Sequence, residues 1–154
     1  MTENLDIELV TMNVGEAQFG IPVLKVRDVL DSPATYPIPL APREIAGSIN
    51  LRGRIVTAID LRVRLGLPPR ASGSSSKCII VDSESAGECY AFIVDDVGEV
   101  LKVFGSAYEP NPITLSKHWA GLCNGLYRRD DGLLLLLNTQ AVLRIEAPDF
   151  SAAA

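Results

Sequence analysis

Short runs of alternating apolar and polar residues, separated by turn residues, extend along most of the chain. Residues 8–14 alternate with the period of two that is typical of a half-buried strand. Gly15 and Glu16 favour a turn, and residues 17–21 can return as the second strand of a hairpin. Residues 23–30 alternate too. So short a segment also fits the period of a helix, but the period of two and the flanking prolines favour a third strand there. Closely spaced strands of this kind favour a sandwich or a barrel over alternating strands and helices.

A second hairpin is indicated on either side of Arg52 and Gly53. Residues 49–51 and 54–59 are apolar arms, and the glycine between them tolerates the positive φ of a tight turn. Before this hairpin, four prolines lie within residues 33–42. They exclude a central strand there, because proline lacks the amide donor that a β-ladder needs. We expect an ordered extended loop instead.

A short helix is expected over residues 61–65, because Asp60 can cap its first turn and Gly66 can end it. The polar stretch at residues 71–76 is typical of a flexible surface loop or of the border between two lobes. We place the loop between the two halves of the chain near residues 68–77.

The second half of the chain has the same character. Strands are expected at residues 78–81 and 89–94, with a turn over residues 82–88 between them, and alternation resumes over residues 97–103. Residues 133–137 are consecutive leucines, so we expect a central strand that is buried on both faces. Residues 139–145 resemble a short terminal helix whose first residue, a threonine, could cap it. The whole pattern predicts a mainly β fold of two small barrels that pack together.

The composition allows a packed core and limits the class of partner. Apolar residues make up 47% of the 154 residues, which excludes a chain that is disordered by composition. The net charge of −5 argues against a general nucleic-acid binder, because phosphate binding requires a dense basic surface. The basic residues are scattered among acidic ones, and we interpret them as solvated surface. They include Lys25, Arg27, Arg43, Arg52, Arg54, Arg62 and Arg64.

The sequence contains no motif typical of an enzyme or of a metal site. His118 is the single histidine, whereas imidazole metal sites use two or three, so we interpret it as a structural or surface residue. Cys78, Cys89 and Cys123 fit neither a metal knuckle nor a CxxC pair, and we interpret them as small core residues. The carboxylates at residues 95–96 are better explained by a turn between strands than by a cation site. We therefore predict no catalytic residue, no metal and no cofactor.

The sequence also predicts a cytoplasmic protein. Residues 1–6 are acidic and lack the basic and then apolar layout of a signal peptide. The longest apolar run, residues 133–137, is far too short to cross a bilayer. Three cysteines without a pairing pattern fit a compartment that keeps thiols reduced.

Two charged residues lie in otherwise apolar surroundings. Asp28 lies on the strand face that also carries Leu30, and Arg52 lies in a tight turn between apolar arms. If the fold brings them together, they form either a solvated ion pair worth about 0–1 kcal/mol or a pair that sets specificity within an apolar interface. The residues alone leave both interpretations open.

Residues 47–67 resemble the signature of CheW-type coupling domains. The signature consists of a glycine, an apolar pair, Asn-Leu-Arg-Gly, an apolar strand, Asp-Leu-Arg and Leu-Gly. Residues 47–67 follow this order, with Ser48 and Ile49 in the place of the apolar pair. Flanking segments at residues 19–26, 37–39 and 92–97 also resemble segments of the family, in the same order along the chain. The resemblance covers about residues 7–146, so the chain is similar to a single domain of this family.

The resemblance implies a fold and a function. The fold is two five-stranded, SH3-like β-barrels, intertwined and packed together within one CheW-like domain over residues 1–154, with short helices that include a C-terminal one. The function is that of a non-catalytic signalling adaptor, which couples methyl-accepting chemoreceptors to the CheA histidine kinase in arrays beneath the membrane. The alternative is the same module in a non-flagellar receptor–kinase pathway, such as type IV pilus motility.

The resemblance also implies site residues. Val26, Asp28 and Arg52 match the receptor-side and signalling positions of the family, and Asp28 takes the place of an acidic residue that engages the arginine. By proximity alone we add the neighbours Val29, Leu51 and Gly53. For the kinase contact we expect the apolar surface of the first barrel, without naming residues. Nucleic-acid binding and direct membrane insertion are not expected.

Overall fold

The computed structural model describes residues 6–31, 34–71, 74–83, 88–130 and 132–145. Parts of three sequence predictions lie outside these residues. They are residue 33 of the proline loop, residues 72–73 of the polar loop and residues 84–87 of the turn that follows the strand predicted at 78–81.

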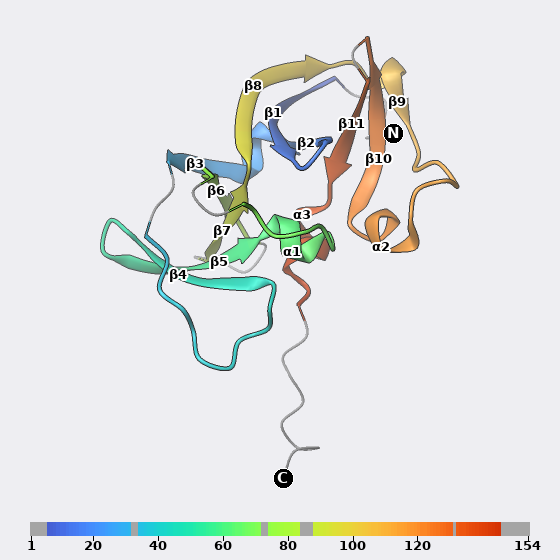
Figure 1. Ribbon diagram of the computed structural model, residues 1–154. Helices are drawn as coiled ribbons and strands as arrows, with labels where there is room; N and C mark the ends of the chain where they lie inside the picture. The colour runs from blue at the N-terminus through green and yellow to red at the C-terminus, as the bar shows by residue number, and fades with distance from the viewer. Residues whose placement is uncertain (1–5, 32–33, 72–73, 84–87, 131, 146–154) are drawn as a thin grey trace.

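Two sheets form the molecule, and they lie side by side as two lobes (Figure 1). One sheet has five strands in the order β3 (Val26–Asp31), β6 (Lys77–Asp82), β7 (Cys89–Val94), β5 (Arg54–Asp60) and β4 (Ile45–Leu51). The other has six, in the order β8 (Asp96–Val103), β1 (Ile7–Val14), β2 (Ala17–Pro22), β11 (Gly132–Leu137), β10 (Cys123–Arg129) and β9 (Tyr108–Glu109). The mainly β fold of two SH3-like barrels is confirmed, with the two-residue β9 as an additional strand.

Short helical segments connect the strands. The α-helices are α1 (Leu61–Arg64), α2 (Lys117–Ala120) and α3 (Thr139–Leu143), and the 3₁₀ turns are η2 (Val23–Lys25) and η3 (Gly105–Ala107). As predicted, Asp60 caps α1, since its Oδ1 accepts a hydrogen bond from the Arg62 amide at 3.0 Å. Gly66 takes a φ of 77° just after this helix.

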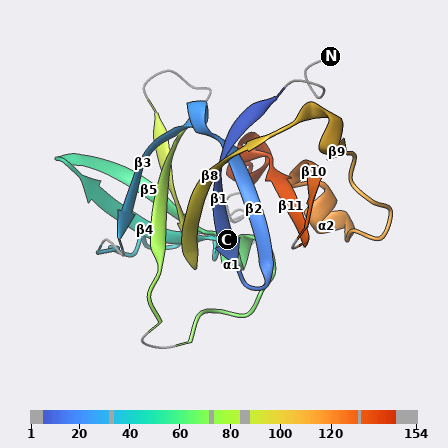
Figure 2. The same ribbon diagram turned by 90° about the horizontal axis from the view of Figure 1, so that it is seen from above.

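The chain passes between the sheets twice. It leaves the six-stranded sheet through η2, builds all five strands of the other sheet, and returns between β7 and β8 (Figure 2). The segment near residues 68–77 joins α1 to β6, so it links two parts of the five-stranded unit and does not separate the sheets. A polar loop indicates an exposed connection, but it carries no information about which sheet the next strand joins.

The core consists of three apolar clusters. The largest lies between the sheets and takes residues from both, including Phe19, Ile79 and Phe92. Smaller clusters fill the inside of the five-stranded and the six-stranded sheet. Along β11, Leu134 enters the six-stranded cluster while Leu135 enters the shared one, which explains the unbroken leucine run. The predicted central strand is confirmed between β2 and β10.

Two local predictions were wrong. Val23–Lys25 forms a 3₁₀ turn and not the start of a strand, because Pro22 has no amide hydrogen to extend the ladder and the chain must turn here toward the other sheet. The cap of α3 is Asn138 and not Thr139. The Asn138 side-chain oxygen accepts a hydrogen bond from the Ala141 amide at 3.1 Å.

Candidate functional site

The turn between β4 and β5 presents Arg52 to solvent. Leu51 pairs with Arg54, so Arg52 and Gly53 form a two-residue loop with φ values of 51° and 86°. Positive φ at both positions is the geometry of a type I′ hairpin turn. The Asn50 side-chain oxygen accepts a hydrogen bond from the Gly53 amide at 2.8 Å and holds the turn. The sequence predicted positive φ for the glycine alone, and the arginine adopts it too.

Arg52 reaches Asp28 across the opening of the five-stranded sheet. Its Nη2 lies 3.2 Å from Asp28 Oδ2, although β3 and β4 are the opposite edges of that sheet. The sheet must therefore curl, and the hydrogen bonds that Tyr36 exchanges with Ser48 on β4, both 2.8 Å, help to close it. The side chains of Arg52 and Asp28 are 83% and 29% exposed, so the pair contributes only about 0–1 kcal/mol to folding.

The other expected site residues are distributed over several surroundings. Burial alternates along β3. Val26 and Asp28 are half-buried on one face of the strand, and Val29 is exposed on the other face together with Asp31. Val26 packs against the core shared by the sheets, and Leu51 packs against the core of the five-stranded sheet. The structure thus brings Asp28 and Arg52 together, whereas Val29 lies on the opposite, solvent side of β3.

A groove of about 580 Å³ lies where the chain crosses between the sheets. It is lined by Asp6, Ile7, Glu8, Pro22, Val23, Leu24 and Lys102. Leu24 is 95% exposed there. Sequence reasoning missed these residues, because alternation over residues 23–30 predicts one strand. Pro22 was the signal that could have placed a turn here.

A second charged cluster lies beside α1. Arg62 donates from Nε and Nη2 to both carboxylate oxygens of Asp95, at 2.9 and 2.8 Å. Arg70 Nε forms an ion pair with Asp95 Oδ1 at 2.9 Å, and Arg70 Nη1 donates to Asp60 at 3.1 Å. All four side chains are between 14% and 22% exposed. The interpretation of Arg62 as solvated surface was therefore wrong. Asp95 does lie in the predicted turn between β7 and β8, and it also forms ion pairs with residues far away in sequence.

The carboxyl of Asp95 is stabilised in its charged form. Burial raises its pKa, but the hydrogen bonds from Arg62 and from the Gly15 amide, together with the charges of Arg62 and Arg70, outweigh burial and hold the pKa below its ordinary value. In the unfolded chain, an aspartate carboxyl has a pKa of about 3.9. The ion pairs therefore stabilise the folded protein fully above that pH and lose their effect as the pH falls through the lower folded pKa.

We predict that the stability advantage of the wild type over Asp95→Asn shrinks as the pH is lowered from about 7 to about 3, across the range in which carboxylates titrate. Urea unfolding at each pH measures the two free energies of unfolding. Asp96→Asn removes the neighbouring carboxyl, which accepts a hydrogen bond from the Val97 amide and lies outside this cluster, and serves as the control. A difference between wild type and Asp95→Asn that stays constant over this range contradicts the assignment.

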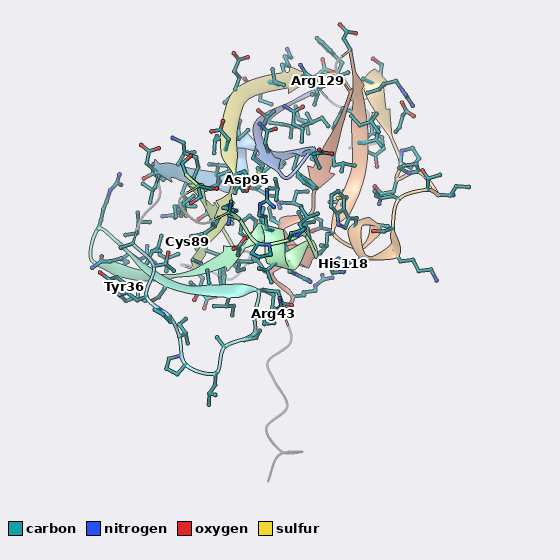
Figure 3. The ribbon with its side chains drawn as sticks, in the orientation of Figure 1. Tyr36, Arg43, Cys89, Asp95, His118 and Arg129 are labelled. Atoms are coloured by element: carbon teal, nitrogen blue, oxygen red, sulfur yellow. The ribbon has the colours of Figure 1, made fainter. Side chains whose placement is uncertain are left out.

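The cysteines and the histidine have structural surroundings. Cys78 and Cys123 are buried, and burial raises the pKa of their thiols to about 12 and about 11. Cys89 is partly exposed (Figure 3). His118 Nε2 lies 2.6 Å from the carbonyl oxygen of Arg64 at the end of α1.

We predict that a maleimide reagent labels only Cys89 in the folded protein, because thiolates are the reactive species and the other two thiols are both buried and protonated. Mass spectrometry should find one label in buffer and three in denaturant. Rapid labelling of Cys78 or Cys123 without denaturant would contradict the packing of the cores in which these residues are buried.

Among the residues that the structure describes, no group of three or more histidine, cysteine, aspartate or glutamate side chains is placed to hold a metal ion. No helix in the described ranges is long and apolar enough to span a bilayer.

Comparison with known proteins identifies the family. The CheW-like domain family matches residues 8–147. The probable chemotaxis protein CheW of Rhizobium etli is 28% identical over 138 residues, which cover 89% of this chain and 87% of that protein. The chemotaxis protein CheW of Rhizobium meliloti is 27% identical over 139 residues, which cover 90% and 88%.

A solved structure agrees with these relatives. The crystal structure of the scaffolding protein TtCheW from Thermoanaerobacter tengcongensis matches with a TM-score of 0.81 at 27% identity, over 94% of this chain and 97% of that one. The resemblance noted in the sequence is thereby confirmed over nearly the whole chain. The chain belongs to the CheW-like domain family of chemotaxis scaffolding proteins.

Proposed function

We propose that this protein is a cytoplasmic, non-catalytic adaptor that couples methyl-accepting chemoreceptors to the CheA histidine kinase. The observation that carries the proposal is the Asp28–Arg52 pair. The fold assembles it from the two edges of a curled sheet and leaves the guanidinium largely exposed. A pair that adds so little to stability is well suited to act on a partner.

The groove supports the receptor side of this proposal. It begins at Val23 and Leu24, directly before Val26 on β3, and it carries both apolar walls and charges. An amphipathic helix can lay its apolar face into such a groove. We propose that the receptor hairpin tip docks there and that Asp28 and Arg52 set its specificity.

Exposed apolar residues support the kinase side. Tyr36, Leu40 and Ile55 are large apolar residues of the five-stranded unit that are mostly exposed. Apolar side chains of this size supply affinity in protein interfaces when they are desolvated. We propose that these residues contribute to binding the regulatory region of the kinase.

The proposal is tested by reconstitution with receptor-containing membranes and purified kinase. Kinase autophosphorylation should rise when the protein is added to both partners together, and it should not rise when receptors are left out. Unchanged phosphorylation, with a kinase shown to be active and receptors shown to be inserted, would contradict the proposed coupling.

A further inference from the structure

The two sheets are held together beside α1 by a cluster of four charged side chains, and we propose that this cluster fixes the angle between the sheets. We call it the strut, and it comprises Asp60, Arg62, Arg70 and Asp95. The inference depends on the proposed function in one respect only: a fixed angle between the sheets would keep the two docking surfaces at a fixed spacing.

The strut connects both sheets through Asp95. This residue lies where the chain passes from β7 to β8, in the middle of the molecule (Figure 3). Its Oδ2 accepts a hydrogen bond from the amide of Gly15, in the β1–β2 turn, at 2.7 Å, and its own amide donates to Asn13 O at 3.0 Å. Its other contacts are to Arg62 of α1 and to Arg70. One carboxylate therefore contacts a turn of the six-stranded sheet and the helix that follows β5.

The far side of α1 also contacts helices that belong to the six-stranded unit. Arg64 donates from Nε to Val142 O at 3.0 Å and from Nη2 to Ala141 O at 3.0 Å, both in α3. Trp119 of α2 donates from Nε1 to Leu65 O at 2.9 Å. Since α1 leads directly out of β5, these bonds tie the five-stranded sheet to both helices.

Directional contacts are needed here because the shared core alone is not directional. The hydrophobic effect favours contact between the sheets, but it is non-directional. A guanidinium that donates hydrogen bonds to both oxygens of a carboxylate fixes the distance between the two groups and the relative orientation of their planes. Arg62 binds Asp95 in this way, and the low exposure of the pair limits screening by salt.

The inference is tested by measuring distances between spin labels. In a Cys89→Ser background, the substitutions Ile55→Cys and Val100→Cys place one label on each sheet, at exposed positions. Val100→Cys with Leu133→Cys places both labels on the six-stranded sheet. Each pair is measured with and without Asp95→Asn.

We expect Asp95→Asn to broaden the distance distribution between the sheets and to leave the distribution within the six-stranded sheet unchanged. Asp96→Asn, which removes the neighbouring carboxyl outside the strut, should change neither. An unchanged between-sheet distribution in folded Asp95→Asn protein would overturn the inference. If that variant does not fold, Arg62→Gln, which removes the two-point contact with Asp95, is measured instead, and the same two outcomes decide.

A second measurement separates this inference from the proposed function, because the distances require no partner. In the reconstituted kinase assay, Asp95→Asn should bind each partner separately as the wild type does but activate the kinase less, by about fivefold or more. Broadened distances with full activation would show that the angle is not used in coupling. Failure of the wild type to activate the kinase would instead count against the proposed function, and the distance result would still stand.

Discussion

Replacing Gly47 with alanine is expected to destabilise the protein by about 3 kcal/mol or more. A Cβ at this position would lie 2.3 Å from the carbonyl oxygen of Tyr36, a contact with backbone that no side-chain rotation can relieve. Gly47 also has a φ of 147°, which side chains other than glycine rarely adopt. The bonds between Tyr36 and Ser48 that help to close the five-stranded sheet lie directly beside it.

Gly66→Ala is the matched control for this prediction. Gly66 also has a positive φ, 77°, but nothing lies within 4 Å of its Cβ position. We therefore expect a loss of only about 1 kcal/mol, from backbone strain alone. Urea unfolding of both variants measures the difference. Equal losses of unfolding free energy in the two variants would contradict the predicted clash between the Cβ at position 47 and the carbonyl oxygen of Tyr36.

Arg52→Glu is expected to weaken receptor binding by on the order of 30-fold while the fold stays intact. The substitution places a like charge beside Asp28, in the centre of the proposed receptor site. Because the native pair is exposed, the free energy of unfolding should change by less than about 1 kcal/mol. Binding to receptor fragments and urea unfolding are measured on the same preparation.

Two further variants make the Arg52 experiment specific. Arg43→Glu changes the net charge by the same amount at another exposed arginine of the five-stranded unit, and it should leave receptor binding unchanged (Figure 3). The double variant Asp28→Arg with Arg52→Glu restores an opposite pair with the charges exchanged. If binding partly recovers in the double variant, the effect belongs to the ion pair. If binding does not recover, the effect belongs to the arginine itself. Equal loss in Arg43→Glu and Arg52→Glu would contradict the site.

Much of the fold follows from local patterns. Alternation marked the β1–β2 hairpin, and the leucine run at residues 133–137 marked a strand between two cores. Asp60 and Gly66 marked the ends of α1, because capping and positive φ depend on residues near in sequence. These features need no knowledge of distant partners.

The features that sequence missed depend on contacts between distant parts of the chain. Asp95 and Arg62 are 33 residues apart, and nothing local distinguishes them from surface charges. The crossing at η2 was missed because three residues of a 3₁₀ turn fit an alternating pattern as well as a strand does. For the Asp28–Arg52 pair, the local sequence shows only that each charged residue has apolar neighbours. The two side chains meet because the five-stranded sheet curls, and no local pattern predicts this.

The central claim is that one molecule docks a receptor and a kinase at the same time. Co-sedimentation with receptor-bearing vesicles tests it most directly, using the protein with vesicles alone, with kinase alone, and with both together. We predict that the protein sediments with the vesicles and brings the kinase down beyond the amount that vesicles retain without it. If the kinase and the vesicles compete for the protein, so that adding one releases the other, simultaneous docking is contradicted.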